Sequence, residues 1–188
     1  RLGIEHYRRH FIKPNRPIDD YVHTEDLFDE NDIINALSNH DFIIPVHESL
    51  ANTSVYDLYV ICFHEQADQI VKWMREYFKD QPNYLEALFN YMSHNRLVRA
   101  NMLITRKEEY DKYCETMFTM IDYLKQHIPV EKPDSSVWGY VTELFPAIYI
   151  DANKKSYIEV DMAVDDFNQD IQKDVVYVTY NKKEEDFS

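Results

Sequence analysis

The sequence has 188 residues and a formal net charge of −14 at pH 7, from 20 Lys and Arg against 34 Asp and Glu. This length fits one domain that can bury a core without disulfides, and a content of 45% hydrophobic and 14% aromatic residues excludes a disordered chain. The acidic balance argues against nonspecific nucleic-acid binding, no apolar run approaches the ~20 residues of a membrane-spanning helix, and two cysteines exclude a disulfide scaffold or four-thiolate zinc site.

The patterns of the first half predict strands and helices in alternation. In chain order they are a short buried strand over residues 2–5, a helix over 31–37, a strand over 41–45, a polar loop over 47–53, a helix that starts at about residue 54 and whose apolar spacing continues to 78, and a helix over 83–93. Ser54 is a plausible N-cap of its helix, and Pro82 is placed to open the next one.

The second half continues in the same way. The predicted elements are a strand over residues 96–105, a long helix over 107–128, a helix containing 139–150, and short strands over 156–160 and 175–180. The sequence therefore predicts an α/β fold whose middle and C-terminal half are rich in helices. We expect one domain over residues 1–150 and an acidic C-terminal extension with short strands over 151–188.

Glycine is scarce in this sequence. Only Gly3 and Gly139 occur, so neither of the glycine-rich loops that cradle phosphates in dinucleotide-binding and ATP-binding proteins can form. Any phosphate group bound by this chain must be held by side chains or by the N-terminus of a helix.

His6, Tyr7, Arg8 and Arg9 follow the first predicted strand. Strand ends are where α/β folds place their binding sites, and two adjacent guanidinium groups match the oxygens of a diphosphate. The alternative is a solvated strand edge, or pairing of the two arginines with acidic residues of the following loop. Spacing alone leaves both interpretations open.

His64 and Asp68 are four residues apart, which places them on one face of a predicted helix. They fit a pair of polar contacts for a ligand, an ion pair or two ligands of a metal site. Two ligands do not complete a metal site, so a metal-dependent hydrolase would use His6 as well. An ordinary pair on a helix surface is the simpler alternative.

Asn101 and Glu143 are polar residues in otherwise apolar patterns. An amide within a strand either faces a ligand or satisfies a neighbouring loop, and Asn101 fits both descriptions. Glu143 fits a general base whose pKa is raised by partial burial, and it fits equally a first-turn carboxylate that complements the helix dipole.

Seven short strings occur in the order of the motifs of one known family. They are GIEHYRRHF over residues 3–11, DFIIP over 41–45, SVYDLY over 54–59 followed by His64 and Asp68, PNY over 82–84, NMLI over 101–104, YCE over 113–115 and GYVTE over 139–143. These strings resemble the signatures of a bacterial glycosyltransferase-like family, long catalogued as domain of unknown function 4422. The resemblance covers roughly residues 1–150.

Members of that family occur in capsule, exopolysaccharide and O-antigen synthesis. The resemblance implies a GT-A type glycosyltransferase fold, with a mixed sheet flanked by helices, and a nucleotide-sugar donor. It implies a cytoplasmic location, which would be the inner face of the cell membrane if the protein associates peripherally with it. It also implies a glycan or lipid-linked acceptor and no nucleic-acid partner. It leaves open a divalent metal, Mn or Mg, as cofactor, and the oligomeric state.

The resemblance also assigns roles to the residues singled out above. His6, Tyr7, Arg8, Arg9 and Asn101 are expected to bind the donor. No Asp-x-Asp metal motif follows the first strand, so the cationic side chains would replace a metal as the counter-charge of the leaving diphosphate.

The remaining assignments concern chemistry and the acceptor. Glu143 is expected to be the catalytic base, and Tyr59, His64, Asp68 and Tyr140 are expected to contact the acceptor. The abundant aromatic side chains suit stacking against sugar rings.

The sequence departs from the family pattern in three ways. Leu144 stands where the family has an arginine, and Thr116 stands where it has a tryptophan. We also expect that the family's first stretch, which would build nucleotide-binding strands, lies upstream of residue 1, and that a fragment without it would be inactive. The alternative function is a non-catalytic carbohydrate-binding or assembly subunit that retains the acceptor half of the fold.

Overall fold

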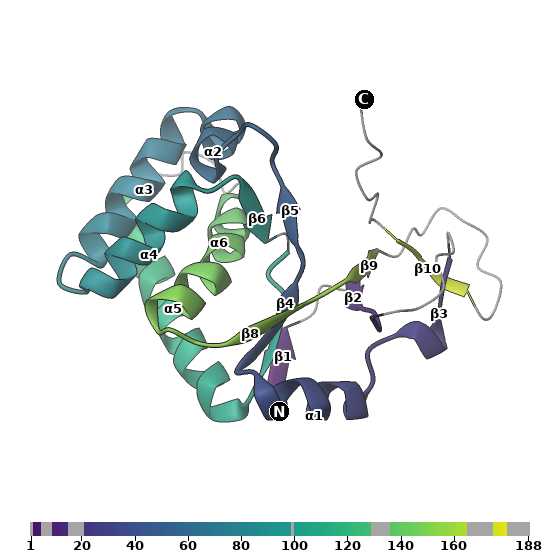
Figure 1. Ribbon diagram of the computed structural model, residues 1–188. Helices are drawn as coiled ribbons and strands as arrows, with labels where there is room; N and C mark the ends of the chain where they lie inside the picture. The colour runs from purple at the N-terminus through teal and green to yellow at the C-terminus, as the bar shows by residue number, and fades with distance from the viewer. Residues whose placement is uncertain are drawn as a thin grey trace.

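The computed structural model describes residues 2–4, 9–14, 21–98, 100–128, 136–164 and 175–179 (Figure 1). Its strands are β1 (Leu2–Ile4), β2 (Arg9–Phe11), β3 (Tyr21–His23), β4 (Phe42–Pro45), β5 (His47–Ser49), β6 (Arg96–Val98), β7 (Leu103–Thr105), β8 (Tyr157–Val160), β9 (Met162–Val164) and β10 (Val175–Thr179). Its helices are a short 3₁₀ helix (Thr24–Asp26), α1 (Glu30–Asn39), α2 (Val55–Phe63), α3 (Glu65–Tyr77), α4 (Pro82–Ser93), α5 (Lys107–His127) and α6 (Ser136–Ala152).

A four-stranded mixed sheet lies at the centre of the fold, with the strand order β1-β7-β4-β8. β7 is antiparallel to both β1 and β4, and β8 is parallel to β4. β1, β4 and β8 therefore run in the same direction, and their carboxyl ends lie at one edge of the sheet. The predicted α/β class, with a mixed sheet flanked by helices, is confirmed.

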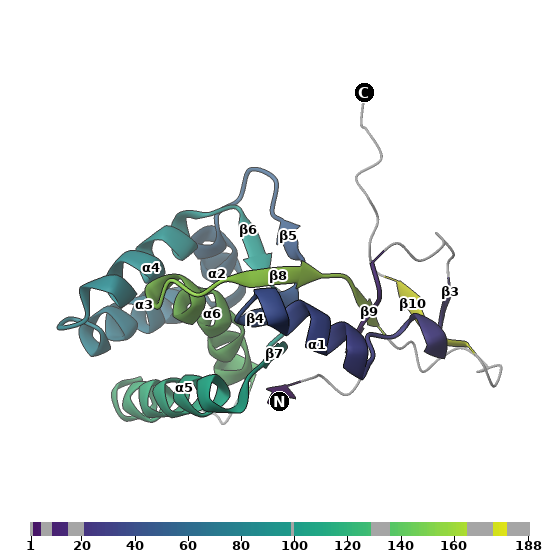
Figure 2. The ribbon, with the colours of Figure 1, turned by 60° about the horizontal axis from the view of Figure 1, so that its bottom comes forward.

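The two faces of this sheet are covered differently. Phe42 and Ile44 of β4 belong to the large core formed with α2 to α6, whereas Ile43 belongs to a smaller cluster that includes Leu37 of α1. Side chains alternate between faces along a strand, so three consecutive hydrophobic residues reach both clusters. Figures 1 and 2 show the large helical layer on one side of the sheet and α1 apart from it.

Local sequence explains where the helices begin. The Ser54 hydroxyl accepts a hydrogen bond from the Asp57 backbone N–H, and the Asp57 carboxylate accepts one from the Ser54 backbone N–H, so the expected N-cap of α2 is part of a full capping box. Pro82 occupies the first turn of α4, as predicted. α5 covers almost the whole predicted helix because buried apolar residues recur along it every three or four positions.

A second sheet has the order β2-β9-β10-β3, with antiparallel pairing throughout. It lies beyond the end of β8, because β9 begins two residues after β8 ends (Figure 1). β5 and β6 form a separate antiparallel ribbon, in which His47 pairs with Val98. The sequence predicted a loop in place of β5 and no strand in place of β2, β3 or β9.

The helix predicted from residue 54 to residue 78 is two helices. His64 ends α2 and begins α3 with φ 49° and ψ −127°, which is a backbone conformation outside the helical region. The interpretation of His64 and Asp68 as neighbours on one continuous helix was therefore wrong. The apolar periodicity missed the break because the residues on both sides of it face the same core.

The strand predicted over residues 96–105 is also two elements. β6 pairs with β5 and β7 pairs with β4 and β1, so the two strands belong to different sheets. The turn between them includes Ala100 with φ 65°, a left-handed conformation that ends a strand. Asn101 therefore lies in a bend and not within a strand.

β8 is a full member of the central sheet. Its four residues pair in register with β4, from Phe42 with Tyr157 to Pro45 with Val160. The sheet therefore continues past residue 150, where the sequence placed the end of the domain.

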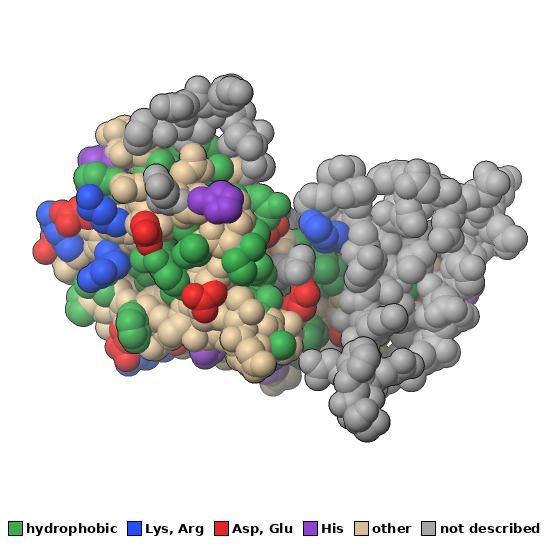
Figure 3. All heavy atoms as spheres, turned by 90° about the horizontal axis from the view of Figure 1, so that it is seen from above, with side chains coloured by type: hydrophobic (Ala, Val, Ile, Leu, Met, Phe, Trp, Pro, Cys, Tyr) green, Lys and Arg blue, Asp and Glu red, His purple; other side chains and the backbone are tan. Residues whose placement is uncertain are grey.

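The surface of the described part mixes side-chain types. Large exposed hydrophobic residues include Ile61, which is 65% exposed, and Phe89, which is 74% exposed. In Figure 3 hydrophobic side chains lie among charged ones over the helices. Within the described residues, none of the helices combines the length and the apolar character needed to cross a bilayer.

Candidate functional site

The carboxyl edge of the central sheet is the first region of interest. The chain leaves β1 there toward residues 5–8, leaves β4 toward Val46 and His47, and leaves β8 toward Asp161. Asn101 precedes the antiparallel strand β7 by two positions, so it lies at the same edge. Open α/β sheets bind ligands outside the carboxyl ends of their strands.

The predicted donor-binding residues are only partly within the described residues. His6, Tyr7 and Arg8 lie outside them. Arg9 is the half-buried first residue of β2 and pairs in register with Val164 of β9. The pairing of β2 with β9 therefore brings Arg9 near the end of β8.

Asn101 is held by the helical layer. The buried Tyr113 hydroxyl of α5 donates a hydrogen bond of 3.1 Å to the Asn101 side-chain oxygen, and burial raises the pKa of Tyr113 well above its usual value. This bond fixes the orientation of the amide, so its –NH₂ group is the part that remains to meet a ligand.

Tyr59, Tyr140 and Glu143 come together between α2 and α6. The Tyr59 hydroxyl donates a hydrogen bond of 2.6 Å to the Tyr140 carbonyl, and the Phe63 ring lies between these two tyrosines, with its centroid 5.3 Å from Tyr59 and 5.0 Å from Tyr140. Burial, followed by the nearby charge of Glu143, raises the pKa of Tyr59. Tyr59 is 3% exposed, so the geometry gives its ring a packing role, whereas Tyr140 is 44% exposed.

His64 and Asp68 make separate contacts. His64 is the exposed residue at the junction of α2 and α3. The Asp68 carboxylate accepts a hydrogen bond from the Tyr56 hydroxyl of α2, which ties the two helices together. Neither residue lines the pocket described next, and the structure does not bring them to Asn101.

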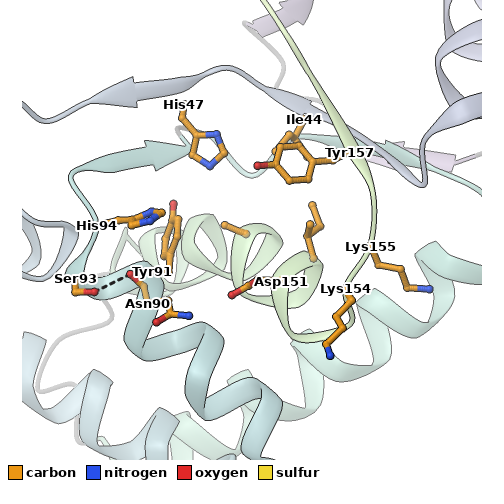
Figure 4. A pocket seen from close by; sticks show the side chains of 12 residues that line it. Ile44, His47, Asn90, Tyr91, Ser93, His94, Asp151, Lys154, Lys155 and Tyr157 are labelled. Carbon is orange, nitrogen blue, oxygen red and sulfur yellow. Dashed lines mark hydrogen bonds between the residues drawn. The ribbon is translucent and has the colours of Figure 1, made fainter.

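A pocket of about 390 Å³ opens between the sheet and the helices α4 and α6 (Figure 4). Its lining residues are Ile44, His47, Asn90, Tyr91, Ser93, His94, Ala147, Ile150, Asp151, Lys154, Lys155 and Tyr157. In Figure 4 His47 and Tyr157 form the sheet side, Asn90, His94 and Asp151 form the helical side, and the two lysines lie at one end. Its volume is in the lower part of the range of small-molecule sites, which is about 300–1,000 Å³.

Glu143 lies next to this pocket without lining it. Burial raises the pKa of Tyr91 to about 12 against the opposing effect of the Val98 N–H, and the charge of Glu143 raises it further. Glu143 and Ala147 are four residues apart in α6 and share one face of the helix. The predicted base is therefore one helical turn beyond a lining residue.

His47 is a half-buried polar group of the pocket that is bonded within the protein. Its Nδ1 atom is 2.8 Å from the Glu159 carboxylate of β8, and its backbone N–H donates to the same carboxylate at 3.3 Å. Arg96 of β6 is 3.4 Å from Glu159 as well. Burial lowers the pKa of His47 and outweighs the opposing effect of Glu159, while Arg96 and His94 lower it further.

This contact defines the tautomer of His47. A neutral imidazole has one N–H, and a carboxylate beside Nδ1 places the proton on Nδ1. The Nε2 atom of neutral His47 is then a hydrogen-bond acceptor.

The last turn of α6 departs from two local rules. Asp151 places a carboxylate near the negative end of the helix dipole. The Lys155 N–H bonds to the Ile150 carbonyl in the pattern of a Schellman motif. Lys154, with φ 51°, occupies the left-handed position of that motif, which is usually glycine. Departures from local preference are expected where a site has a function.

Sequence reasoning missed this pocket. His47 and His94 were in or near predicted loops, and Asp151, Lys154 and Tyr157 fell in the expected C-terminal extension. Asp151 at a helix end followed by a non-glycine stop was the signal that the sequence carried. In the described ranges no three His, Cys, Asp or Glu side chains are grouped in a way that could hold a metal ion.

Comparison with known proteins gives two matches. The model of a family described as a domain of unknown function (DUF4422) matches residues 1–154. Among solved structures, the chain is similar to WbbM, a bifunctional glycosyltransferase in its apo form, with 20% identity and a TM-score of 0.70 over 85% of this chain. The match covers 32% of that protein's chain, so this chain spans about a third of its length. No curated protein matches the chain.

At this level of identity the structural match shows the fold alone. It establishes a glycosyltransferase-like arrangement of helices and sheet for most of the chain.

Proposed function

The chain belongs to the family described as a domain of unknown function (DUF4422), and we propose that it is a glycosyltransferase domain. On this proposal it transfers a sugar from a nucleotide-sugar donor to a hydroxyl of a glycan or lipid-linked acceptor, in the synthesis of a bacterial surface polysaccharide. The observation that carries the proposal is the similarity of its fold to a glycosyltransferase over 85% of the chain.

The donor is proposed to bind at the carboxyl edge of the central sheet. β1, β4 and β8 end there, and the arginines of the sequence Arg8-Arg9 follow β1. Guanidinium groups would offset the charge that develops on the departing diphosphate. Asn101 lies at the same edge and its side-chain oxygen accepts from Tyr113, which supports a role for its –NH₂ group in binding a sugar or ribose hydroxyl.

Donor binding is the first test. The protein that contains this chain, at its full natural length, is heated with uridine, guanosine and thymidine diphosphate sugars, with and without Mn²⁺. A ligand at about 100 times its Kd stabilises the folded state by about 2.7 kcal/mol, which corresponds to a rise of about 5–10 °C in the melting temperature of a domain of this size. If no nucleotide sugar raises the melting temperature under either condition, the proposal is wrong.

Glu143 is proposed as the base that deprotonates the acceptor hydroxyl. Glu143→Gln keeps the size of the side chain but removes its ability to take a proton. We expect turnover to fall about 10²–10⁴-fold while donor affinity is retained. The matched control is Glu115→Gln, at an exposed position of α5, which should leave both unchanged. Full turnover in Glu143→Gln would assign Glu143 a structural role.

A further inference from the structure

We propose that the pocket between β8 and the helices α4 and α6 binds an uncharged sugar unit of the acceptor glycan. The identification of this sugar as the acceptor rests on the proposed function. The binding of a neutral sugar ring rests on the pocket itself.

The first argument is the state of the polar side chains that line the pocket. Asn90, His94, Asp151 and Lys154 have no hydrogen-bond or ion-pair partner for their side chains among the described residues, although all four lie at one pocket. All four are exposed, so they bond to water when no ligand is bound, and a ligand with hydrogen-bonding groups can replace that water in a concave site.

Their neighbours in the lining are already bonded. Lys155 pairs with Glu109 at 2.9 Å, the Tyr91 hydroxyl accepts the Val98 N–H at 3.0 Å, and the Ser93 hydroxyl donates to the Asn90 carbonyl at 2.9 Å. The groups left for a ligand are therefore an amide, an imidazole, a carboxylate and an ammonium group, together with the accepting Nε2 of His47.

This set matches a sugar better than an anion. Each hydroxyl of a sugar both donates and accepts, so it pairs with the carboxylate of Asp151 and with the amide of Asn90 alike. A phosphate or a uronic acid would bring a negative charge beside Asp151. The free charge of Lys154 only balances that of Asp151, and the charge of Lys155 is already matched by Glu109, so the lining has no surplus positive charge for an anion. The pocket therefore favours an uncharged ring over an acidic sugar or a lipid phosphate.

Tyr157 supplies an apolar surface for that ring. Its side chain is 42% exposed on the sheet side, across the pocket from Asp151 (Figure 4). A sugar ring carries C–H groups on one face and hydroxyls at its edge, so it fits between an aromatic side chain and a row of polar groups. The volume of about 390 Å³ suits a ligand of one or two rings.

The position of the pocket fits the acceptor. His47 follows the carboxyl end of β4 by two residues, so the pocket begins at the sheet edge where the donor is proposed to bind. Glu143, the proposed base, lies one helical turn from Ala147 in the pocket wall. Asp151 lies eight residues further along α6 than Glu143, or ~12 Å at the helical rise per residue, so a sugar held by Asp151 would be a unit of the acceptor away from the reacting hydroxyl.

The test measures sugar binding directly. Saturation-transfer NMR and titration on the full-length protein use the methyl glycosides of galactose, glucose and mannose, with methyl glucuronide and geranyl phosphate as the anionic probes. We expect at least one neutral glycoside to bind, and to bind more tightly than either anionic probe. Asp151→Asn should weaken that binding about 10–100-fold, because a charged hydrogen bond is lost.

The control is Asp122→Asn, an exposed aspartate of α5, which should bind the glycoside as the unaltered protein does. Asp151 is exposed near the end of α6, where removal of a carboxylate is not expected to unfold the chain. Absence of binding by all three neutral glycosides, tighter binding of an anionic probe, or equal affinity in Asp151→Asn would overturn the inference.

The result also separates this inference from the proposed function. Stabilisation by a nucleotide sugar without glycoside binding in this pocket would leave the transferase intact and end the inference. Glycoside binding lost in Asp151→Asn, in a protein that no nucleotide sugar stabilises, would keep the sugar site and end the transferase, which is the carbohydrate-binding alternative.

Discussion

Two groups of polar side chains flank the turn from α6 to β8, and they differ in how their hydrogen bonds are used. On one side Glu109 of α5 accepts from the Tyr149 hydroxyl and from Lys155, both at 2.9 Å. On the other side lie the unbonded side chains of the pocket, such as Asp151. The first group has its partners within the protein and joins α5 to α6, whereas the second group is exposed and open to water or a ligand.

The difference separates residues that stabilise the fold from residues that serve a ligand. A partly buried carboxylate with two donors holds its helix in place, and removing it leaves both donors unpaired. A carboxylate without a donor contributes little to stability, and at the end of a helix it is unfavourable. Stability and ligand affinity should therefore respond to different substitutions around the same turn.

The largest expected effect on stability is at Glu109. Its side chain is 15% exposed and that of Lys155 is 27% exposed, so Glu109→Gln leaves a partly buried charge without its counter-charge. We expect the free energy of unfolding to fall by about 2–3 kcal/mol, and the melting temperature to fall by about 5–10 °C. Thermal and denaturant unfolding measure this directly.

Glu115→Gln on the exposed face of the same helix is the matched control and should change the melting temperature by less than about 1–2 °C. Equal melting temperatures for Glu109→Gln and the unaltered protein would show that the side chains bonded to Glu109 stabilise the fold no more than those of the pocket. The distinction between the two groups would then be wrong.

His47 shares a property with each group, because it lines the pocket and its side chain is bonded within the protein. Burial lowers its pKa in the folded state below the usual value of 6.5. The unfolded chain then binds a proton more readily than the folded chain, so stability falls as the pH decreases through 6.5 toward the folded-state pKa. His47→Gln, which cannot be protonated, should show a smaller loss of stability between pH 7 and pH 5.

The charged groups around His47 decide the sign of that effect. Glu159 raises the pKa of His47, whereas Arg96 and His94 lower it together with burial. Urea unfolding of both proteins at several pH values gives the comparison. A steeper decline in His47→Gln than in the unaltered protein would mean that protonated His47 stabilises the fold through Glu159.

The sequence predicted the elements of this fold better than their breaks. α4, α5 and β4 were predicted almost to the residue, because proline, capping residues and apolar spacing mark them locally. The break at His64 and the turn at Ala100 depend on left-handed backbone conformations at non-glycine residues. Tertiary packing imposes these conformations, and the neighbouring residues in the sequence do not predict them.

The candidate site was less predictable for the same reason. Polar positions in apolar patterns predict Asn101, which bonds to the buried Tyr113, and Glu143, whose charge acts on the buried Tyr91. Such positions do not include Asp151 and Lys154, which are polar residues in a polar segment. Only the pairing of β8 with β4 brings that segment against α4.

The smallest expected effect is at Lys154, and its sign is opposite to that at Glu109. Lys154 has a left-handed backbone, with φ 51°, which glycine adopts without strain. Lys154→Gly should raise the free energy of unfolding by about 0.5–1 kcal/mol, less a few tenths for a cation lost from the helix C-terminus.

The same substitution should weaken binding of a neutral methyl glycoside by about 3–10-fold, because one hydrogen-bond donor leaves the open end of the pocket. Lys154→Arg keeps the charge and the backbone strain, so it should retain both the stability and most of the affinity of the unaltered protein. Chemical unfolding and glycoside titration of the three proteins give both readouts. A protein destabilised by glycine would show that Lys154 holds the turn, and Lys154 would then belong with the bonded group around Glu109.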